Sequence, residues 1–280
     1  MRVAGIILAI AAWAGTAQAQ TMRPFATFRQ THGETRLGVR LDYAAGNIRI
    51  APGRSAELYR MDLSYDEDRF VPLSDYDAAS GSVVLGLRAA GDAGVRVVSR
   101  NQLSQVAAVA FSPRPDLALD LNFGAVDADV ELGGLKITSL ALQTGASRTV
   151  VRFSHPNLSR CRRADFSAGA AEFSVLGLGN SRCDEIGFEG GIGKVTLDFS
   201  GAWTSSARVQ VKMAMGELNL RLPRKAGVSI VMDRFLSSFE PVGLLRRGNR
   251  FVSENYERSQ RHLDIDLTTA MGGVNVQWVE

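Results

Sequence analysis

The feature that most constrains this chain is a short pattern of small residues, followed by alternating apolar and polar residues, that recurs along the sequence. Copies begin at residues 44, 124, 145, 169, 191, 214 and 270. Between residues 124 and 214 the starts are spaced by about 22 residues, as is typical of repeat architectures in which each unit packs on the next. The final interval is more than twice as long. Because each copy alternates with period two, each is predicted to be a β-strand.

Aligned copies form columns that separate a core face from a water face. The fifth and seventh residues are almost wholly apolar and are predicted to face a core. The fifth column contains Ile48, Ala128, Thr149, Phe173, Val195, Leu218 and Val274, and the seventh contains Ile50, Val130, Val151, Val175, Leu197, Leu220 and Val276. The fourth residues are mostly polar, so we expect them to face water.

The fourth column carries charges that alternate in sign over five consecutive copies. These residues are Asp127, Arg148, Glu172, Lys194 and Glu217. Opposite charges on adjacent strands stabilise pairing by roughly 0.2–1 kcal/mol, whereas like charges oppose it. We therefore expect one exposed charge ladder on neighbouring coils. The alternation favours an all-β solenoid, a single-stranded β-helix-like stack of coils of about 22 residues, over a barrel or sandwich in which equivalent residues lie two strands apart.

The two cysteines, Cys161 and Cys183, occupy the same position in successive copies. Each belongs to the tripeptide SRC and lies eight residues before the start of a copy, at Gly169 or Gly191. Adjacent coils bring Cα atoms close to the separation that a disulfide needs. The spacing therefore predicts a disulfide, with two free buried thiols as the alternative. Two cysteines without clustered histidines do not make a zinc site.

The ends of the chain depart from the regular middle. Residues 54–113 contain alternating runs at 82–87 and 95–100, so residues 21–113 are predicted to form a β-meander that leads into the solenoid. Residues 114–280 are predicted to form the solenoid repeats. An insertion near residues 232–260 interrupts them, and we expect it to cover the open end of the stack.

The start of the chain, residues 1–20, has the pattern of a secretory signal peptide. Arg2 precedes a short apolar run at 3–13, and Ala17-Gln18-Ala19 resembles a cleavage motif. The run is too short to span a membrane comfortably. We therefore expect a periplasmic or secreted protein, cleaved near Ala19 and exposed to oxidising conditions. The mature net charge would be +3 − 1 = +2, too small to indicate a nucleic-acid partner.

The sequence carries no recognisable catalytic or cofactor motif. Nucleophile-elbow, zinc-protease and phosphate-loop patterns are absent, and the three histidines share no ligand spacing. We therefore expect no enzyme activity, no cofactor and no metal site. Asp127, Asp129 and Glu131 line one strand face, as a pair of glycosidase carboxylates could. Basic residues on the next coil make ion pairing the preferred interpretation of this row.

A group of arginines accompanies the cysteines. Arg160, Arg162, Arg163 and Arg182 form a possible basic contact patch. Such a patch could meet an anionic polymer of the cell envelope, although a solvated edge is the preferred interpretation.

Two segments resemble a known family. The segment "RPDLALDLNFGAVDADVELGGLKITSLALQTGAS" (114–147) and the ending "HLDIDLTTAMGGVNVQW" (262–278), with the repeated small-residue starts, resemble the toast-rack domains over roughly residues 40–279. These are bacterial envelope domains of unknown function, often labelled "putative adhesin", and are related to the C-terminal domain of cell-wall-stress regulators.

The resemblance implies a non-catalytic β-solenoid-like sheet with a structural, adhesive or sensing role, and an envelope protein or polymer as its partner. Unlike the stress regulators, this chain carries no transmembrane helices in its mature part, which argues against a signalling role. Two alternatives remain open at the level of the sequence. One is a carbohydrate-active or carbohydrate-binding β-helix protein, and the other is a small outer-membrane β-barrel.

Overall fold

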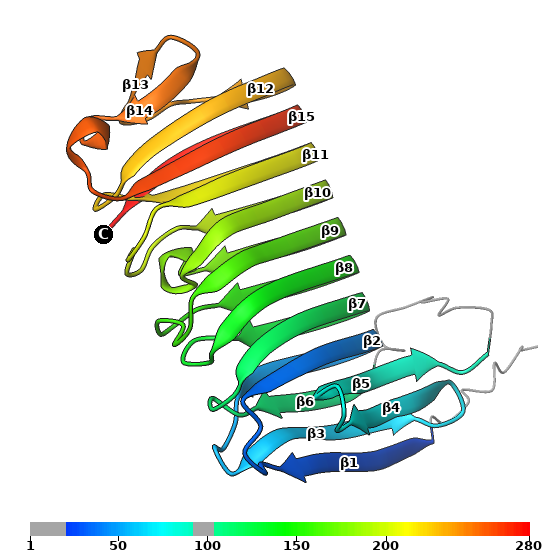
Figure 1. Cartoon of the computed structure of the whole chain (residues 1–280). Coiled ribbons are helices and arrows are strands. Elements are labelled where there is room, and N and C mark those ends of the chain that lie inside the picture. The colour runs from blue at the N-terminus through cyan, green and yellow to red at the C-terminus, as the bar shows by residue number, and fades with distance from the viewer. Residues whose placement is uncertain (1–20, 92–103) are drawn as a thin grey trace, which may run out of the picture.

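The computed structural model describes residues 21–91 and 104–280, and most of these residues lie in strands of one long sheet (Figure 1). The predicted signal peptide and the run at 95–100 lie outside the described residues. None of the helices in the described ranges is long and apolar enough to cross a membrane.

Parallel strands form the body of the sheet. In spatial order they are β2 (Arg36–Pro52), β7 (Asp116–Glu131), β8 (Ile137–Arg152), β9 (Cys161–Leu176), β10 (Cys183–Asp198), β11 (Ala207–Pro223), β15 (His262–Val279) and β12 (Gly227–Phe239). From β7 to β11, each strand pairs in parallel with the next strand along the chain. This confirms the predicted stack of coils, and the sheet is open rather than closed on itself.

Each long strand consists of two legs joined by a bend at the small residues of the repeat. In β7 the buried residues on the first leg are Leu117, Leu119, Leu121 and Phe123, and those on the second are Val126, Ala128 and Val130. The alternation therefore shifts by one residue at the bend. Since side chains alternate between the faces of a strand, this shift keeps apolar side chains inward on both legs.

The core lies between the two layers of legs. Phe166 on the first leg of β9 contacts Phe173 on its second leg, with ring centroids 5.9 Å apart, and Phe173 contacts Phe188 of β10 at 5.6 Å. The two apolar columns predicted from the sequence are buried throughout, including Thr149. Aromatic and aliphatic side chains from successive coils thus form one continuous hydrophobic core.

Glycines allow the backbones to stack at the bends. Gly193 has φ +151°, and a Cβ at this position would overlap the carbonyl oxygen of Ala171 on the preceding coil. Gly216 and Gly272 repeat this arrangement at φ +128° and +129°. Residues with a Cβ rarely adopt such backbone angles, so glycine permits this close approach in β10, β11 and β15. The equivalent residues of β7, β8 and β9 are Val126, Ser147 and Ala171, and none of them has a positive φ, so the bend itself does not require glycine.

At the N-terminal end, separate strands continue the two layers. The strands are β1 (Met22–Gln30), β3 (Glu57–Asp66), β4 (Phe70–Asp77), β5 (Ser82–Ala89) and β6 (Val106–Phe111). The first leg of β2 pairs with β5 and its second leg with β6. Antiparallel β4 follows β5, and antiparallel β3 and β1 follow β6. The strands before and after residue 113, where the meander was predicted to end, belong to one sheet. They do so because β2 is itself a bent strand of the stack.

At the C-terminal end, the order of strands in space departs from their order in sequence. The last strand, β15, lies between β11 and β12, and β14 (Arg250–Ser253) and β13 (Leu244–Arg247) follow β12 in antiparallel pairing (Figure 1). The long final interval of the repeat therefore contains one further bent strand and a hairpin. The first part of the predicted insertion, residues 232–239, belongs to the regular strand β12.

Candidate functional site

The residues of the charge ladder lie in one row across the second legs of β7 to β11. The sheet register places Asp127 beside Arg148, Arg148 beside Glu172, Glu172 beside Lys194, and Lys194 beside Glu217. Among these described residues, only Lys194 and Glu217 form an ion pair with each other, with 3.4 Å between Nζ and Oε2. Hydrogen bonding to Asn219 and the nearby charge of Lys194 lower the pKa of Glu217.

Reversing the central charge of this row should have a small, salt-dependent effect. Glu172→Lys would place three cations in adjacent register positions, and we expect the free energy of unfolding to fall by about 0.5–1 kcal/mol at low salt and by less at high salt. Urea unfolding at two salt concentrations measures this. Glu172→Gln removes the charge without adding repulsion and is the matched control; equal stability of the two variants at low salt would contradict the ladder.

The carboxylates of the glycosidase alternative have structural partners. Asp129 pairs with Arg152 of β8. Glu131 accepts hydrogen bonds from the backbone amides of Gly133 at 2.6 Å and Ser154 at 3.2 Å. Among the described residues, no group of three His, Cys, Asp or Glu side chains is placed to hold a metal ion.

The cysteines are joined where β9 and β10 begin. Cys161 and Cys183 are register partners in these strands, with Cα atoms 4.2 Å apart, and they form a disulfide. Both are buried. The placement follows from their equivalent positions in the repeat, and it links two successive coils at the start of their first legs, away from the bends.

Two of the arginines near the disulfide form ion pairs with carboxylates. Arg160 pairs with Asp184 at 2.9 Å, and Arg163 pairs with Asp165 at 2.6 Å and with Glu185 at 3.2 Å. The hydrogen bond from Arg163 to Asp165 and the negative charge of that carboxylate raise the pKa of Arg163.

Arg182 makes its contacts in the loop before β10. It has φ 57°, and its guanidinium donates to the carbonyl oxygen of Asn157 at 3.2 Å. Together with the ion pairs of Arg160 and Arg163, this contact gives three of the four arginines partners within the fold. Acidic neighbours thus neutralise much of the positive charge near the disulfide.

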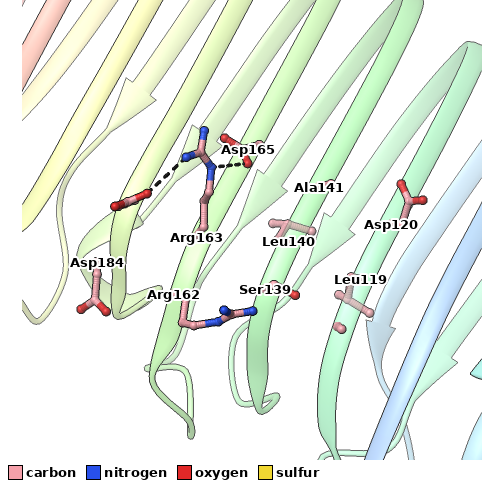
Figure 2. A pocket seen from close by; sticks show the side chains of 11 residues that line it. Leu119, Asp120, Ser139, Leu140, Ala141, Arg162, Arg163, Asp165 and Asp184 are labelled. Atoms are coloured by element: carbon pink, nitrogen blue, oxygen red, sulfur yellow. Dashed lines mark hydrogen bonds and ion pairs between the residues drawn. The ribbon is translucent and has the colours of Figure 1, made fainter. Parts of the chain in front are cut away.

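A groove of about 620 Å³ crosses the first legs of β7, β8 and β9 and reaches the start of β10 (Figure 2). Its residues combine an apolar floor with a charged rim. The floor contains Ala118, Leu119, Leu140 and Ala141, and the rim contains Asp120, Ser139, Arg162, Arg163, Asp165, Asp184 and Glu185. We refer to this feature as the mixed-charge groove.

Arg162 is the available cation of the mixed-charge groove. Its side chain is exposed and makes no hydrogen bond or ion pair with any part of the chain that the structure describes. In Figure 2 its side chain extends toward Ser139 of β8. Asp120 lies across the groove on β7, where the amide of Asn122 donates to its carboxylate at 3.2 Å. The groove therefore offers a guanidinium and a carboxylate on either side of an apolar floor.

Four acidic residues of the groove were not predicted from the sequence to belong to a site: Asp120, Asp165, Asp184 and Glu185. The sequence did contain a signal for two of these residues, Asp184 and Glu185. When the repeats are aligned, "SRCRR" at 159–163 matches "SRCDE" at 181–185. The basic pair of one coil is thus replaced by an acidic pair in the next, which predicts ion pairs across the two strands.

Residues 18–176 match the model of a protein family described as the N-terminal domain of toast_rack, DUF2154. The match covers 176 − 17 = 159 of the 280 residues, which is more than half of the chain. No curated protein matches the chain.

Two solved structures illustrate the likeness of this chain to known proteins. One is a "putative cell adhesion protein" from Clostridium sporogenes ATCC 15579, with a TM-score of 0.47, 16% identity, and coverage of 92% of this chain and 100% of that chain. The other is a "putative adhesin" from Bacteroides fragilis NCTC 9343, with a TM-score of 0.33, 9% identity, and coverage of 91% of this chain and 97% of that chain. Likenesses at this level do not indicate a function.

Proposed function

The chain belongs to the family of the toast_rack N-terminal domain, and from this premise we propose that it is a non-enzymatic protein of the cell envelope that binds another envelope component. The disulfide between Cys161 and Cys183 supports an oxidising compartment. The pattern at the start of the chain, residues 1–20, supports export.

The observation that carries the binding role is the exposed guanidinium in the mixed-charge groove. Within the described parts of the chain Arg162 has no ion-pair partner, whereas neighbouring Arg163 is held between two carboxylates. A guanidinium binds carboxylate and phosphate groups through paired hydrogen bonds, so Arg162 is suited to an anionic group of a ligand. The sheet beneath it provides a fixed spacing to the other groups of the groove.

The other groups of the groove indicate which chemical groups the partner would carry. Asp120 can accept hydrogen bonds from an amine or hydroxyl, and Ala118 with Ala141 provides apolar contact. A purely anionic polymer would meet several carboxylates on the rim. A peptide or a peptide-bearing polymer, which carries both charges and apolar side chains, fits this arrangement better.

The carboxylates of the enzyme alternative have partners within the fold. Asp129 is paired with Arg152, and backbone amides hold Glu131. These contacts give both carboxylates a structural role in joining coils. They leave the mixed-charge groove, on the opposite legs of the strands, as the candidate for recognition.

The proposal predicts that Arg162→Ala weakens binding to peptide-bearing envelope material by at least about tenfold, the expected effect of losing one charged hydrogen bond. The measurement is cosedimentation with isolated peptidoglycan, together with capture of detergent-extracted envelope proteins. Arg148→Ala removes an exposed arginine from the second leg of β8 and should bind like the wild type.

Equal binding by Arg162→Ala and the wild-type protein would exclude the mixed-charge groove as the binding site. Release of soluble fragments from peptidoglycan by the wild-type protein would show that the chain is an enzyme. Selective retention on peptidoglycan or on envelope proteins identifies which source of peptide is bound.

A further inference from the structure

A row of exposed apolar side chains follows the bends in the C-terminal half of the stack. Its members are register neighbours on β10, β11, β15 and β12, namely Ile192, Met215, Met271 and Leu236, with exposures of 59%, 42%, 44% and 59%. The equivalent residues of β8 and β9 are Ala146 and Ala170. The row of large apolar side chains therefore begins at β10 and ends at β12.

Phe235 extends this row at the bend of β12. The sheet register gives Phe235 the bend position that Ala214 and Ala270 hold in β11 and β15. Its side chain is 81% exposed, more than any other large apolar side chain of the described residues. Contiguous exposed apolar side chains mark surfaces that contact a partner or a membrane. We refer to Phe235 and the four side chains of the row as the bend ridge.

The bend ridge lies on the outer side of the bends. In β11, β15 and β12 two consecutive residues are exposed at the bend, at 214–215, 270–271 and 235–236, so both point away from the core. The hairpin of β13 and β14 is joined to β12 only at Ser229–Val231, before the bend. In Figure 1 the bends line one margin of the stack, and the hairpin lies near the other. The ridge is therefore open to the surroundings.

Mostly polar residues flank the ridge on both sides and keep it narrow. The row on the first legs contains Glu189, Lys212, Thr268 and Asp233, and the row on the second legs contains Lys194, Glu217, Gly273 and Ser238. A stable protein interface buries about 800 Å² of each partner around an apolar centre. A narrow convex ridge does not offer such a surface, whereas fluid acyl chains can close around it.

The charged row on the first legs suits a head group that carries both charges. Glu189 and Lys212 are register neighbours, and Asp233 lies two strands beyond Lys212. All three are exposed, and none of them makes a hydrogen bond or ion pair with the described parts of the chain. A hollow of about 430 Å³ separates this row from Phe235. Lys212 can bind a phosphate there while Glu189, about 4.8 Å away across the ladder, binds an ammonium group.

We propose that the bend ridge attaches the protein to the surface of a phospholipid membrane with zwitterionic head groups, such as those of phosphatidylethanolamine. The ridge enters among the acyl chains, and a head group occupies the hollow beside Lys212. The charges that flank the ridge balance, because Lys194, Lys212 and Arg234 are matched by Glu189, Glu217 and Asp233. Attachment therefore depends on apolar insertion rather than on net charge. It is independent of the binding role proposed for the mixed-charge groove, which shares no residue with this hollow.

Cosedimentation with vesicles of phosphatidylethanolamine and phosphatidylcholine in equal amounts tests the attachment. The mature protein should bind at low and at high salt, because salt does not screen apolar insertion. Leu236→Asp should weaken binding at least about tenfold, since a carboxylate at this position would have to leave water. The matched control is Leu158→Asp, which changes a leucine of 55% exposure in the loop between β8 and β9 and should bind like the wild type. Circular dichroism establishes that each variant is folded.

A charge reversal tests the contact with the head group. Lys212→Glu would place a carboxylate where the phosphate is expected, and it should weaken binding at low salt by about threefold. Arg162→Ala, which alters the mixed-charge groove, should leave binding to these vesicles unchanged. Unchanged binding by Lys212→Glu would exclude the head-group contact, and weaker binding by Arg162→Ala would place the lipid in the groove instead.

A fluorescent label identifies the part of the surface that enters the lipid. Both native cysteines are engaged in the disulfide, so Leu236→Cys and Leu158→Cys each add one thiol for an environment-sensitive dye. On addition of vesicles, the emission of the dye at position 236 should shift to the blue, and that of the dye at position 158 should not. Equal shifts at the two positions would overturn the proposal. So would a wild-type protein that does not bind, binding that survives Leu236→Asp, or binding only to anionic phosphatidylglycerol vesicles at low salt.

Discussion

Replacing Gly193 with alanine should destabilise the fold by about 3 kcal/mol, the upper range for a residue forced into strained backbone geometry. Gly193 has φ +151°, and its new Cβ would overlap the carbonyl oxygen of Ala171. That oxygen belongs to the backbone of the neighbouring coil, so it cannot move without disturbing the stack of bends. Urea unfolding of the oxidised protein measures the loss.

Gly145→Ala is the matched control for this substitution. Gly145 lies outside the left-handed region, and its Cβ would be 3.2 Å from the nearest atom, the carbonyl oxygen of Gly124. Other copies carry alanine in the same column, at residues 44, 214 and 270. We expect a loss below about 1 kcal/mol. Equal losses in the two variants would show that close stacking at Gly193 does not limit stability.

Removing the disulfide should lower the free energy of unfolding by about 3 kcal/mol, as the chain-entropy estimate for a loop of this length gives. The bond joins residues 22 apart in sequence. The double variant Cys161→Ala and Cys183→Ala should match the reduced wild-type protein in denaturant unfolding. Reductant should have no effect on the variant.

Thiol counting provides an independent check on the disulfide. The unreduced wild-type protein, unfolded in denaturant, should contain no free thiol, because the sequence has two cysteines and both are joined. Two reactive thiols in protein isolated from an oxidising compartment would contradict the bond.

The stack of coils could be predicted because its signals are local and repeated. The columns that contain Phe173 and Val175 recur with nearly constant spacing, and all their members are buried. The second legs of the strands therefore followed from the sequence. The first legs did not, because the alternation shifts by one residue at the bend and a period-two pattern ends there. Strands β7 to β11 are consequently more than twice as long as the copies of the repeat.

The candidate site could be predicted only in part. The alternating charges from Asp127 to Glu217 indicated the register row, but not which neighbours would approach within ion-pair distance, as Lys194 and Glu217 do. Such distances depend on side-chain rotamers that a sequence pattern does not determine. Similarly, the arginines near Cys161 suggested a basic patch, whereas acidic residues of the next coil neutralise much of its charge.

The order of the last strands in the sheet could not be predicted from the repeat pattern. Strands β12 and β15 both bury apolar residues, so either could follow β11 by that criterion alone. The structure places β15 there, and β12 lies beyond it. Periodicity determines which face of a strand is buried, but not which of two similar strands is the nearer neighbour.

This placement makes the completion of the sheet depend on a strand that is synthesised after β12. Until residues 262–279 have emerged, β11 and β12 each lack the neighbour that separates them. The coils up to β11 can therefore form in the order of synthesis, but the pairing of β11 and β12 with β15 must await residues 262–279. A chain truncated before His262 would retain the early coils and leave two unpaired edges, which is the state most prone to association with other incomplete chains.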